Sequence, residues 1–172
     1  GVGVIYLNPI YLAYSNHRYD SADYMSIDDT LGTKEDLHEL CNEALKRDIY
    51  IILDMVFSHT GSDSIYFDKN KTFNKGGAFN NPHSQYKNWY SINEDGTYDS
   101  WWGIETLPNT NETDPGFMSH VFDSIEQWLS LGVKGFRLDV ADELPDIFIK
   151  ELRKTLKSFD PEAVLIGEVW ED

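Results

Sequence analysis

Cysteine, basic residues and long apolar runs are all scarce in this chain of 172 residues. The one cysteine, Cys41, cannot form an internal disulfide, so the redox compartment stays open. No apolar stretch approaches the roughly 20 residues that cross a bilayer, so we expect a soluble protein without membrane contact, cytoplasmic or secreted. Lys and Arg number 14 against 30 Asp and Glu, a formal net charge of −16. Such a surface would repel phosphates and argues against nucleic acid as a partner.

An opening methionine is also absent. The chain begins "GVGVIYLNPI", without a leading loop, and we expect it to be part of something longer. What is present in quantity is aromatic side chains, which make up 14% of the residues. That content fits both a hydrophobic core and surfaces on which rings stack.

Apolar runs and helical patterns alternate along the chain. Short apolar runs predict buried strands at residues 1–7, 49–59, 133–140 and 163–170. Between them, apolar residues at helical spacing predict helices over 33–48, 115–131 and 145–158, the first with a Thr33/Asp36 capping pattern. This order predicts an α/β protein with a parallel sheet covered by helices. Periodicity alone leaves a β/α barrel and a doubly wound open sheet as alternatives.

The last three predicted strands end in carboxylates, namely Asp54, Asp139 and Glu168. Because parallel strands bring their carboxyl ends to one edge of the sheet, we expect these acids to lie together there. Residues 60–112, between two of these strands, show no sustained period. An insertion of that length is uncommon and is usually functional.

The stretch "GFRLDVADE", residues 135–143, places two charges in a predicted buried strand. Side chains alternate along a strand, so Arg137 and Asp139 point to one face while Phe136 and Leu138 point to the other. Burying an unpaired charge costs several kcal/mol. The two residues must therefore form an ion pair, take part in chemistry, or both.

Five stretches in order resemble the α-amylase family, glycoside hydrolase family thirteen. "DMVFSH", "GFRLDVADE" and "GEVW" resemble its three main signatures, while "HRYDSADYMSID" and "LPNTNE" resemble the segment after barrel strand two and the inserted signature. Two short stretches are similar to the motifs of the neopullulanase and cyclomaltodextrinase branch, and each departs from that branch at one residue. They are Asp142-Glu143, and Glu168-Val169-Trp170 followed by Glu171-Asp172. The resemblance implies strands two to five of a (β/α)8 TIM barrel. Its parts would be 1–59, an inserted subdomain 60–112, and 113–172.

The resemblance also implies roles. Asp139 would be the nucleophile, its pKa lowered by Arg137, and Glu168 the general acid and base with a raised pKa. His59 would hydrogen-bond the sugar, Tyr19 would stack on it, and Asp54 would brace Arg137. The implied reaction is retaining hydrolysis of α-glucosidic bonds in maltodextrin, starch or pullulan. The alternatives are a transglycosylase of the same family and a non-catalytic relative that acts as a binding module. The resemblance also implies a third catalytic carboxylate outside this chain.

Other residues keep two interpretations. Trp101 and Trp102 form either a sugar platform or the small core of the insertion, and Glu143 either contacts substrate or caps a turn. We predict an oligo- or polysaccharide partner and no resident cofactor. Calcium is the alternative, but no EF-hand spacing is present, and Ser58 stands where the family often has a metal-linked Asn.

Overall fold

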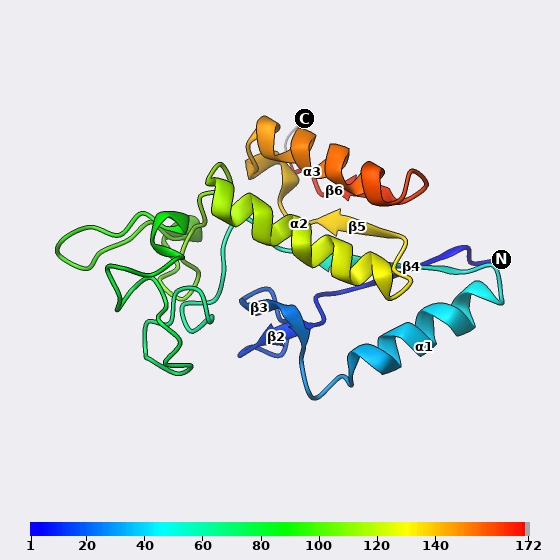
Figure 1. Cartoon of the computed structure of the whole chain (residues 1–172), viewed down its shortest axis with the longest axis horizontal. Helices are drawn as coiled ribbons and strands as arrows, with labels where there is room; N and C mark the ends of the chain where they lie inside the picture. The colour runs from blue at the N-terminus through cyan, green and yellow to red at the C-terminus, as the bar shows by residue number, and fades with distance from the viewer. Residues whose placement is uncertain (171–172) are drawn as a thin grey trace.

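A parallel four-stranded sheet forms the centre of the protein in a computed structural model that describes residues 1–170 (Figure 1). Its order is β1–β4–β5–β6, with every neighbouring pair parallel. The strands are β1 Val4–Leu7, β4 Tyr50–Met55, β5 Gly135–Leu138 and β6 Val164–Gly167. Each parallel crossover in this sheet runs through a helix, so the alternation in the sequence is confirmed.

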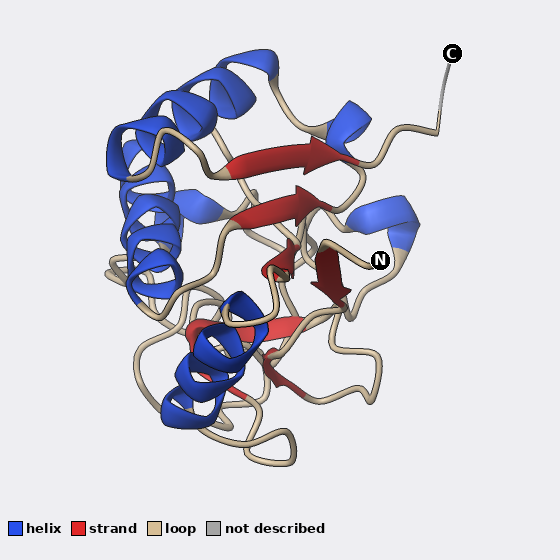
Figure 2. Ribbon diagram, turned by 90° about the vertical axis from the view of Figure 1, so that its right-hand side faces the viewer, coloured by secondary structure: helices blue, strands red, loops and turns tan. Residues whose placement is uncertain are grey.

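Three helices connect the strands, and the first two begin at residues whose side chains cap them. They are α1 Lys34–Leu45, α2 Pro115–Ser130 and α3 Asp146–Phe159. Thr33 and Asp36 form the predicted capping box on α1, and the Asp114 side chain accepts hydrogen bonds from two backbone N–H groups at the start of α2. In Figure 2 most of the helical ribbon lies to one side of the parallel strands. The opposite side of the sheet carries the charged residues of β4 and β5.

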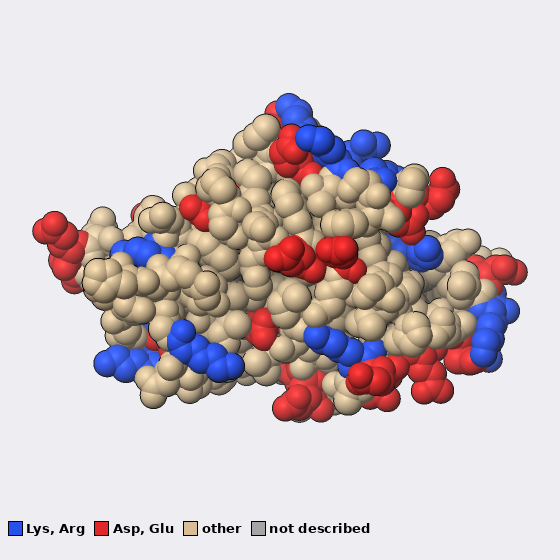
Figure 3. Space-filling model, viewed as in Figure 1, with Lys and Arg blue, Asp and Glu red and all other residues tan. Residues whose placement is uncertain are grey.

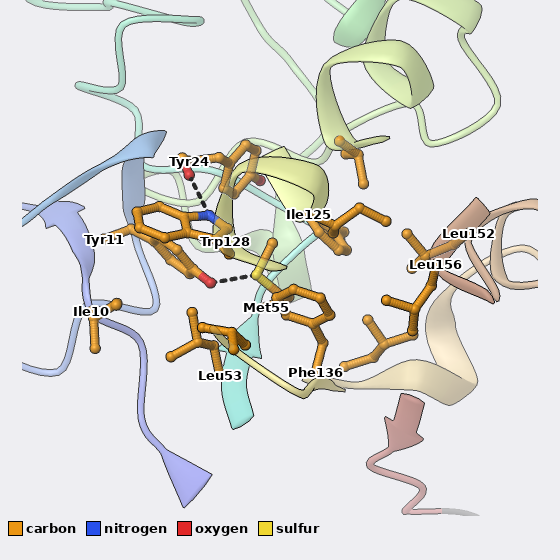
Figure 4. Packing of buried hydrophobic residues seen from close by; sticks show 14 of the residues in the cluster. Ile10, Tyr11, Tyr24, Leu53, Met55, Ile125, Trp128, Phe136, Leu152 and Leu156 are labelled. Carbon is orange, nitrogen blue, oxygen red and sulfur yellow. Dashed lines mark hydrogen bonds between the residues drawn. The ribbon is translucent and has the colours of Figure 1, made fainter. Parts of the chain in front are cut away.

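The core lies between the sheet and the helices and is rich in aromatic rings (Figure 4). Trp128 of α2 is fully buried, and its indole N–H donates to the backbone oxygen of Tyr24 at 3.0 Å. The Tyr11 hydroxyl contacts the sulfur of Met55. Phe136 and Leu138 are each 1% exposed on this side, which confirms the predicted alternation in β5.

An antiparallel pair, β2 Tyr11–Ala13 and β3 Ser21–Ile27, was not predicted. Its strands flank the polar loop 14–20, and the pairing contains register shifts that interrupt any period of two. Tyr24 of β3 is nevertheless fully buried, so the pair joins the main core.

The two outer strands of the sheet were expected to be buried, but they are partly exposed. Val4 in β1 is 49% exposed and Ile166 in β6 is 47% exposed, whereas Ile51 and Leu53 of β4 are almost fully covered. The difference is positional, because β4 and β5 have strands on both sides and β1 and β6 are edges.

Residues 60–112 contain two short 3-10 helices, η1 Lys87–Trp89 and η2 Trp101–Gly103, and otherwise run as loops. The two ends of this segment lie side by side. Thr60 N–H donates to Pro108 O at 3.1 Å, and Thr110 N–H donates to Ser58 O at 3.1 Å. The rings of Tyr66, Phe67 and Trp89 are buried, and those of Tyr66 and Trp89 pack on Tyr24 and Phe117, which lie outside this segment. The domain boundaries at 59/60 and 112/113 stay predictions.

Candidate active site at the carboxyl ends of the strands

Strand register brings the predicted acids to one edge of the sheet. Asp54 of β4 is aligned with Arg137 of β5. Asp139 follows β5, and its N–H donates to Met55 O at 3.0 Å. Glu168 follows β6, and its N–H donates to Leu138 O at 3.0 Å. The backbone ladder thus fixes all three carboxylates at neighbouring strand ends.

The guanidinium of Arg137 contacts each of these carboxylates. Its Nη1 lies 2.7 Å from Asp54 Oδ1 and 2.8 Å from Asp139 Oδ1, and its Nη2 lies 2.6 Å from Glu168 Oε2. Arg137 and Asp139 therefore do form an ion pair, within a larger cluster. The pKa of Arg137 is raised: burial lowers it, but the hydrogen bonds of Asp54 and Asp139 and the charge of Asp54 outweigh that effect.

Asp54 is fully buried beneath the cluster. Besides Arg137, its Oδ2 accepts a hydrogen bond from the Tyr19 hydroxyl at 2.8 Å and one from the Tyr6 hydroxyl. Three donors thus compensate the burial of one carboxylate. This geometry supports the predicted bracing of Arg137, and Tyr19 approaches the site from the loop between β2 and β3.

The pKa shifts of the two candidate catalytic acids run opposite to expectation. Burial raises the pKa of Asp139 to about 6, and the charges of Asp54 and Glu168 add to this, while Arg137 acts against it. For Glu168, burial also raises the pKa, but hydrogen bonds and Arg137 outweigh it, and the pKa lies below its usual value. The expectation was wrong because it left out the burial of Asp139 and counted Arg137 as a neighbour of Asp139 alone.

Backbone strain accompanies the turn after β5. Val140 has φ 40° and ψ 52°, a left-handed conformation that is unusual for a β-branched residue. In this conformation the Val140 N–H donates to Glu168 Oε2 at 3.1 Å. The strained residue thus links the ends of β5 and β6 and leads into the 3-10 helix η3, Ala141–Glu143. Strain of this kind clusters at functional sites.

His59 lies at the start of the insertion and is 2% exposed. Its Nε2 lies 3.2 Å from Tyr19 O and its Nδ1 lies 3.0 Å from Ser58 Oγ. Burial lowers the pKa of His59 to about 4, so the ring is neutral near pH 7. One face of the ring lies near the Trp101 indole, with centroids 5.3 Å apart.

The two tryptophans of η2 stack on each other, with centroids 5.2 Å apart and planes at 22°. They are not the core of the insertion, since Trp102 is 71% exposed. Their indole N–H groups both donate to Glu143, at 2.8 Å from Trp101 and 3.1 Å from Trp102. The Glu143 side chain therefore does not cap a turn, because it accepts hydrogen bonds from the two indoles.

Two adjoining pockets open at this edge. The first, of about 420 Å³, is lined by six of the predicted residues together with His17, Leu107, Val140 and Trp170. The six are Tyr19, His59, Trp101, Arg137, Asp139 and Glu168. The second, of about 320 Å³, contains Trp102 and Glu143.

The sequence-based prediction missed four pocket residues, namely His17, Leu107, Val140 and Trp170. All four stand inside motifs that had been recognised, "HRYDSADYMSID", "LPNTNE", "GFRLDVADE" and "GEVW", and this position is the signal that could have identified them. The two residues after Trp170, which entered the resemblance to the neopullulanase branch, lie outside the described residues.

Metal-binding geometry is not found within residues 1–170, where no group of three or more His, Cys, Asp and Glu side chains could hold an ion. In the segment "DKNKTFNKGGAFNNP", residues 68–82, which is rich in side-chain oxygens, the carboxylate of Asp68 accepts the N–H groups of Phe73 and Asn74 at 3.1 and 3.0 Å. Among the helices of the described chain, none combines the length and apolar character that a membrane span requires.

Fold and site together define an α/β protein with a carboxylate-lined pocket at the carboxyl ends of a parallel sheet. The alpha-amylase family model, described as "Alpha amylase, catalytic domain", matches residues 1–172. The chain belongs to this family, as its motifs had predicted.

Named relatives agree with the family. The chain is 40% identical to an amylopullulanase from Thermoanaerobacterium saccharolyticum, with all of the chain and 15% of that protein covered. It is 34% identical to neopullulanase 2 from Thermoactinomyces vulgaris, covering 100% of the chain and 30% of that protein. The chain thus spans less than a third of these relatives.

Among solved structures, the ligand-free cyclic alpha-maltosyl-(1→6)-maltose hydrolase from Arthrobacter globiformis superposes with a TM-score of 0.88. The two sequences are 34% identical, and the match covers 99% of this chain and 39% of the other. The predicted fold class, part of a β/α barrel with a parallel sheet, is confirmed.

Proposed function

We propose that the complete protein is a retaining glycoside hydrolase that cleaves α-glucosidic bonds in maltodextrin, starch or pullulan-type substrates. Asp139 is the nucleophile and Glu168 the general acid and base. The relatives named amylopullulanase and neopullulanase support this substrate class. The observation that carries the proposal is that Asp139 and Glu168 line one pocket and both contact the guanidinium of Arg137.

Close carboxyl groups favour a retaining reaction. A retaining enzyme needs its two carboxyl groups about 5 Å apart, because one of them must reach the anomeric carbon itself. Asp139 and Glu168 contact the same guanidinium, through Nη1 and Nη2 of Arg137, which keeps the two carboxyl groups near each other. The formal net charge of −16 is compatible with an uncharged sugar as the ligand. Acidic and basic side chains are interspersed on the face that Figure 3 shows.

Individual oxygens can be assigned to steps. Arg137 contacts Oδ1 of Asp139, so Oδ2 is the oxygen that attacks the anomeric carbon and forms the glycosyl ester. Arg137 and Val140 both contact Oε2 of Glu168, so Oε1 is the oxygen that gives its proton to the departing glycosidic oxygen. Glu168 then removes a proton from water, which attacks the ester and releases the sugar.

Tyr19, His59 and Trp101 surround the pocket and bind the sugar in this proposal. To hydrogen-bond a sugar hydroxyl, neutral His59 would exchange its contact with Ser58 Oγ or with Tyr19 O. The aromatic faces of Tyr19 and Trp101 are suited to the C–H surface of the sugar. Transglycosylation uses the same covalent intermediate, with a sugar hydroxyl replacing water in the second step.

The first test replaces the nucleophile. In the complete protein Asp139→Asn should lower kcat on maltodextrin by about 10⁴-fold or more, since the residue forms the covalent bond. Asp146→Asn, an exposed change in α3, is the matched control and should retain full activity. Near wild-type turnover of pure Asp139→Asn enzyme would remove Asp139 from this role.

A second test separates the acid from the nucleophile. Glu168→Ala should lower kcat on maltodextrin about 10²- to 10⁴-fold but largely spare formation of the covalent intermediate from an α-glucosyl fluoride, whose leaving group needs no proton. Added azide should then restore turnover by attacking the ester. Equal loss on both substrates, with no effect of azide, would assign Glu168 another function.

A further inference from the structure

Beside the active site, one carboxylate that follows β5 accepts hydrogen bonds from two tryptophans of the insertion. Trp101 and Trp102 lie in η2, while Glu143 ends η3, four residues after Asp139. Each oxygen of the Glu143 carboxylate accepts one indole N–H, Oε2 from Trp101 and Oε1 from Trp102. The carboxylate thus joins two segments that are about forty residues apart in sequence.

The tryptophan pair needs this support. Trp102 adopts φ 51° and ψ 26°, a left-handed conformation that costs free energy in a residue other than glycine. Its side chain is 71% exposed, so burial alone does not hold the ring in place. Charge-assisted hydrogen bonds are about twice as strong as neutral ones, and two of them share the Glu143 carboxylate.

The second pocket lies on this arrangement. Its walls are Trp101, Trp102, Val140, Asp142, Glu143 and Trp170. Three of these, Trp101, Val140 and Trp170, also line the first pocket, so the two spaces adjoin. The Asp142 carboxylate accepts the Trp170 N–H at 3.0 Å, which fixes the wall on the β6 side.

Resting on the proposed function, we propose that Glu143 is a positioning residue that holds Trp101 and Trp102 as the wall of a binding site for a second sugar ring. Both oxygens of its carboxylate are occupied by indole N–H groups, so Glu143 acts through the tryptophans. The apolar face of a pyranose stacks on the indoles, as aromatic side chains bind other flat apolar surfaces.

A spectroscopic test needs no activity. Stacked indoles give an exciton couplet in the circular dichroism spectrum, and in the complete protein Glu143→Ala should lose most of it, with Glu143→Gln retaining part through one carbonyl acceptor. Glu94→Gln, an exposed change in the insertion, is the matched control and should keep the couplet. Unchanged helical dichroism in each variant excludes unfolding as the cause. An exciton couplet as strong in Glu143→Ala as in the wild-type protein would show that Glu143 does not position the two tryptophans.

Kinetics then test the sugar site. KM for maltodextrin should rise about two- to tenfold in Glu143→Ala, the range for one aromatic contact. Its kcat should stay within about twofold, because the contact is equal in ground and transition states. A lost couplet with unchanged KM overturns the second sugar site. If the wild-type protein cleaves no α-glucan, the proposed function fails, while the couplet still decides whether Glu143 positions the tryptophans.

Discussion

At the scale of residues, one positive charge faces three negative ones. The guanidinium of Arg137 contacts Asp54, Asp139 and Glu168, and fully buried Asp54 has two tyrosine hydroxyls as further donors. With the cation shared, Asp139 and Glu168 compete for it. The pKa values differ accordingly, because burial raises the pKa of the more buried Asp139, whereas hydrogen bonds and Arg137 lower the pKa of the more exposed Glu168.

A pH dependence follows from these shifts. The proposed reaction needs one proton on the pair, and the singly protonated pair exists between the lowered pKa of Glu168 and the pKa of Asp139 at about 6. Because the proton then resides mainly on Asp139, the reactive form that carries it on Glu168 is the minor form of the pair. Above pH 6 that proton leaves and no acid remains, and below the lower pKa both groups are neutral and no nucleophile remains. The measurement is kcat/KM on maltodextrin against pH in the complete protein, which should peak below pH 6. A plateau that extends to pH 8 would contradict this order of pKa values.

At the scale of elements, local signals predicted the helices well. Thr33 with Asp36, and Asp114 before Pro115, mark the first turns of α1 and α2 in the sequence, and caps act over only three residues. The alternation in β5 likewise placed Arg137 and Asp139 on one face. The β2–β3 pair could not be found in this way, because register shifts break its periodicity.

Other features depend on partners distant in sequence. Exposure of β1 and β6 follows from their edge positions, which no single segment records. The contact between Glu143 and the indoles joins η2 and η3 in space, so the sequence left Glu143 with two interpretations. The pKa order of Asp139 and Glu168 also could not be predicted, since it depends on how one guanidinium is shared.

The N-terminal cap of α2 provides a test at this scale. Asp114 Oδ1 accepts the N–H groups of Gly116 and Phe117 at 2.9 and 3.0 Å. Asp114→Ala should lower the free energy of unfolding by about 0.5–2 kcal/mol, as measured by urea denaturation of the complete protein. Asp123→Ala, an exposed change within the same helix, should alter it by less than about 0.5 kcal/mol. Equal effects would mean that the cap contributes nothing measurable.

At the scale of the whole molecule, Tyr66 ties the insertion to the sheet region. Its hydroxyl accepts the Tyr24 N–H at 2.9 Å, lies 2.8 Å from His120 Nε2 and donates to Asp23 at 3.2 Å. Tyr66→Phe would leave the buried Tyr24 N–H without its acceptor. We expect this change to lower the free energy of unfolding by about 1–3 kcal/mol.

The matched control is Tyr86→Phe. Tyr86 contacts the same ring at 5.3 Å, and within residues 1–170 its hydroxyl makes no hydrogen bond. Urea denaturation of the complete protein should show little change for this variant. A similar loss in both would mean that ring packing, and not the hydroxyl, joins the insertion to the rest.

The paired ends of the insertion have a consequence for how such proteins diversify. Ser58 to Thr60 lie against Pro108 to Thr110, so the chain leaves the sheet and returns to it at one place. Once a loop is closed at its base, doubling its length costs only about 0.6 kcal/mol of entropy. Evolution can therefore lengthen, shorten or exchange this segment while the strands and their acids stay where they are. Because the entropic cost of changing its length is small, this segment is also the place to graft a foreign loop when a different sugar chain is to be bound.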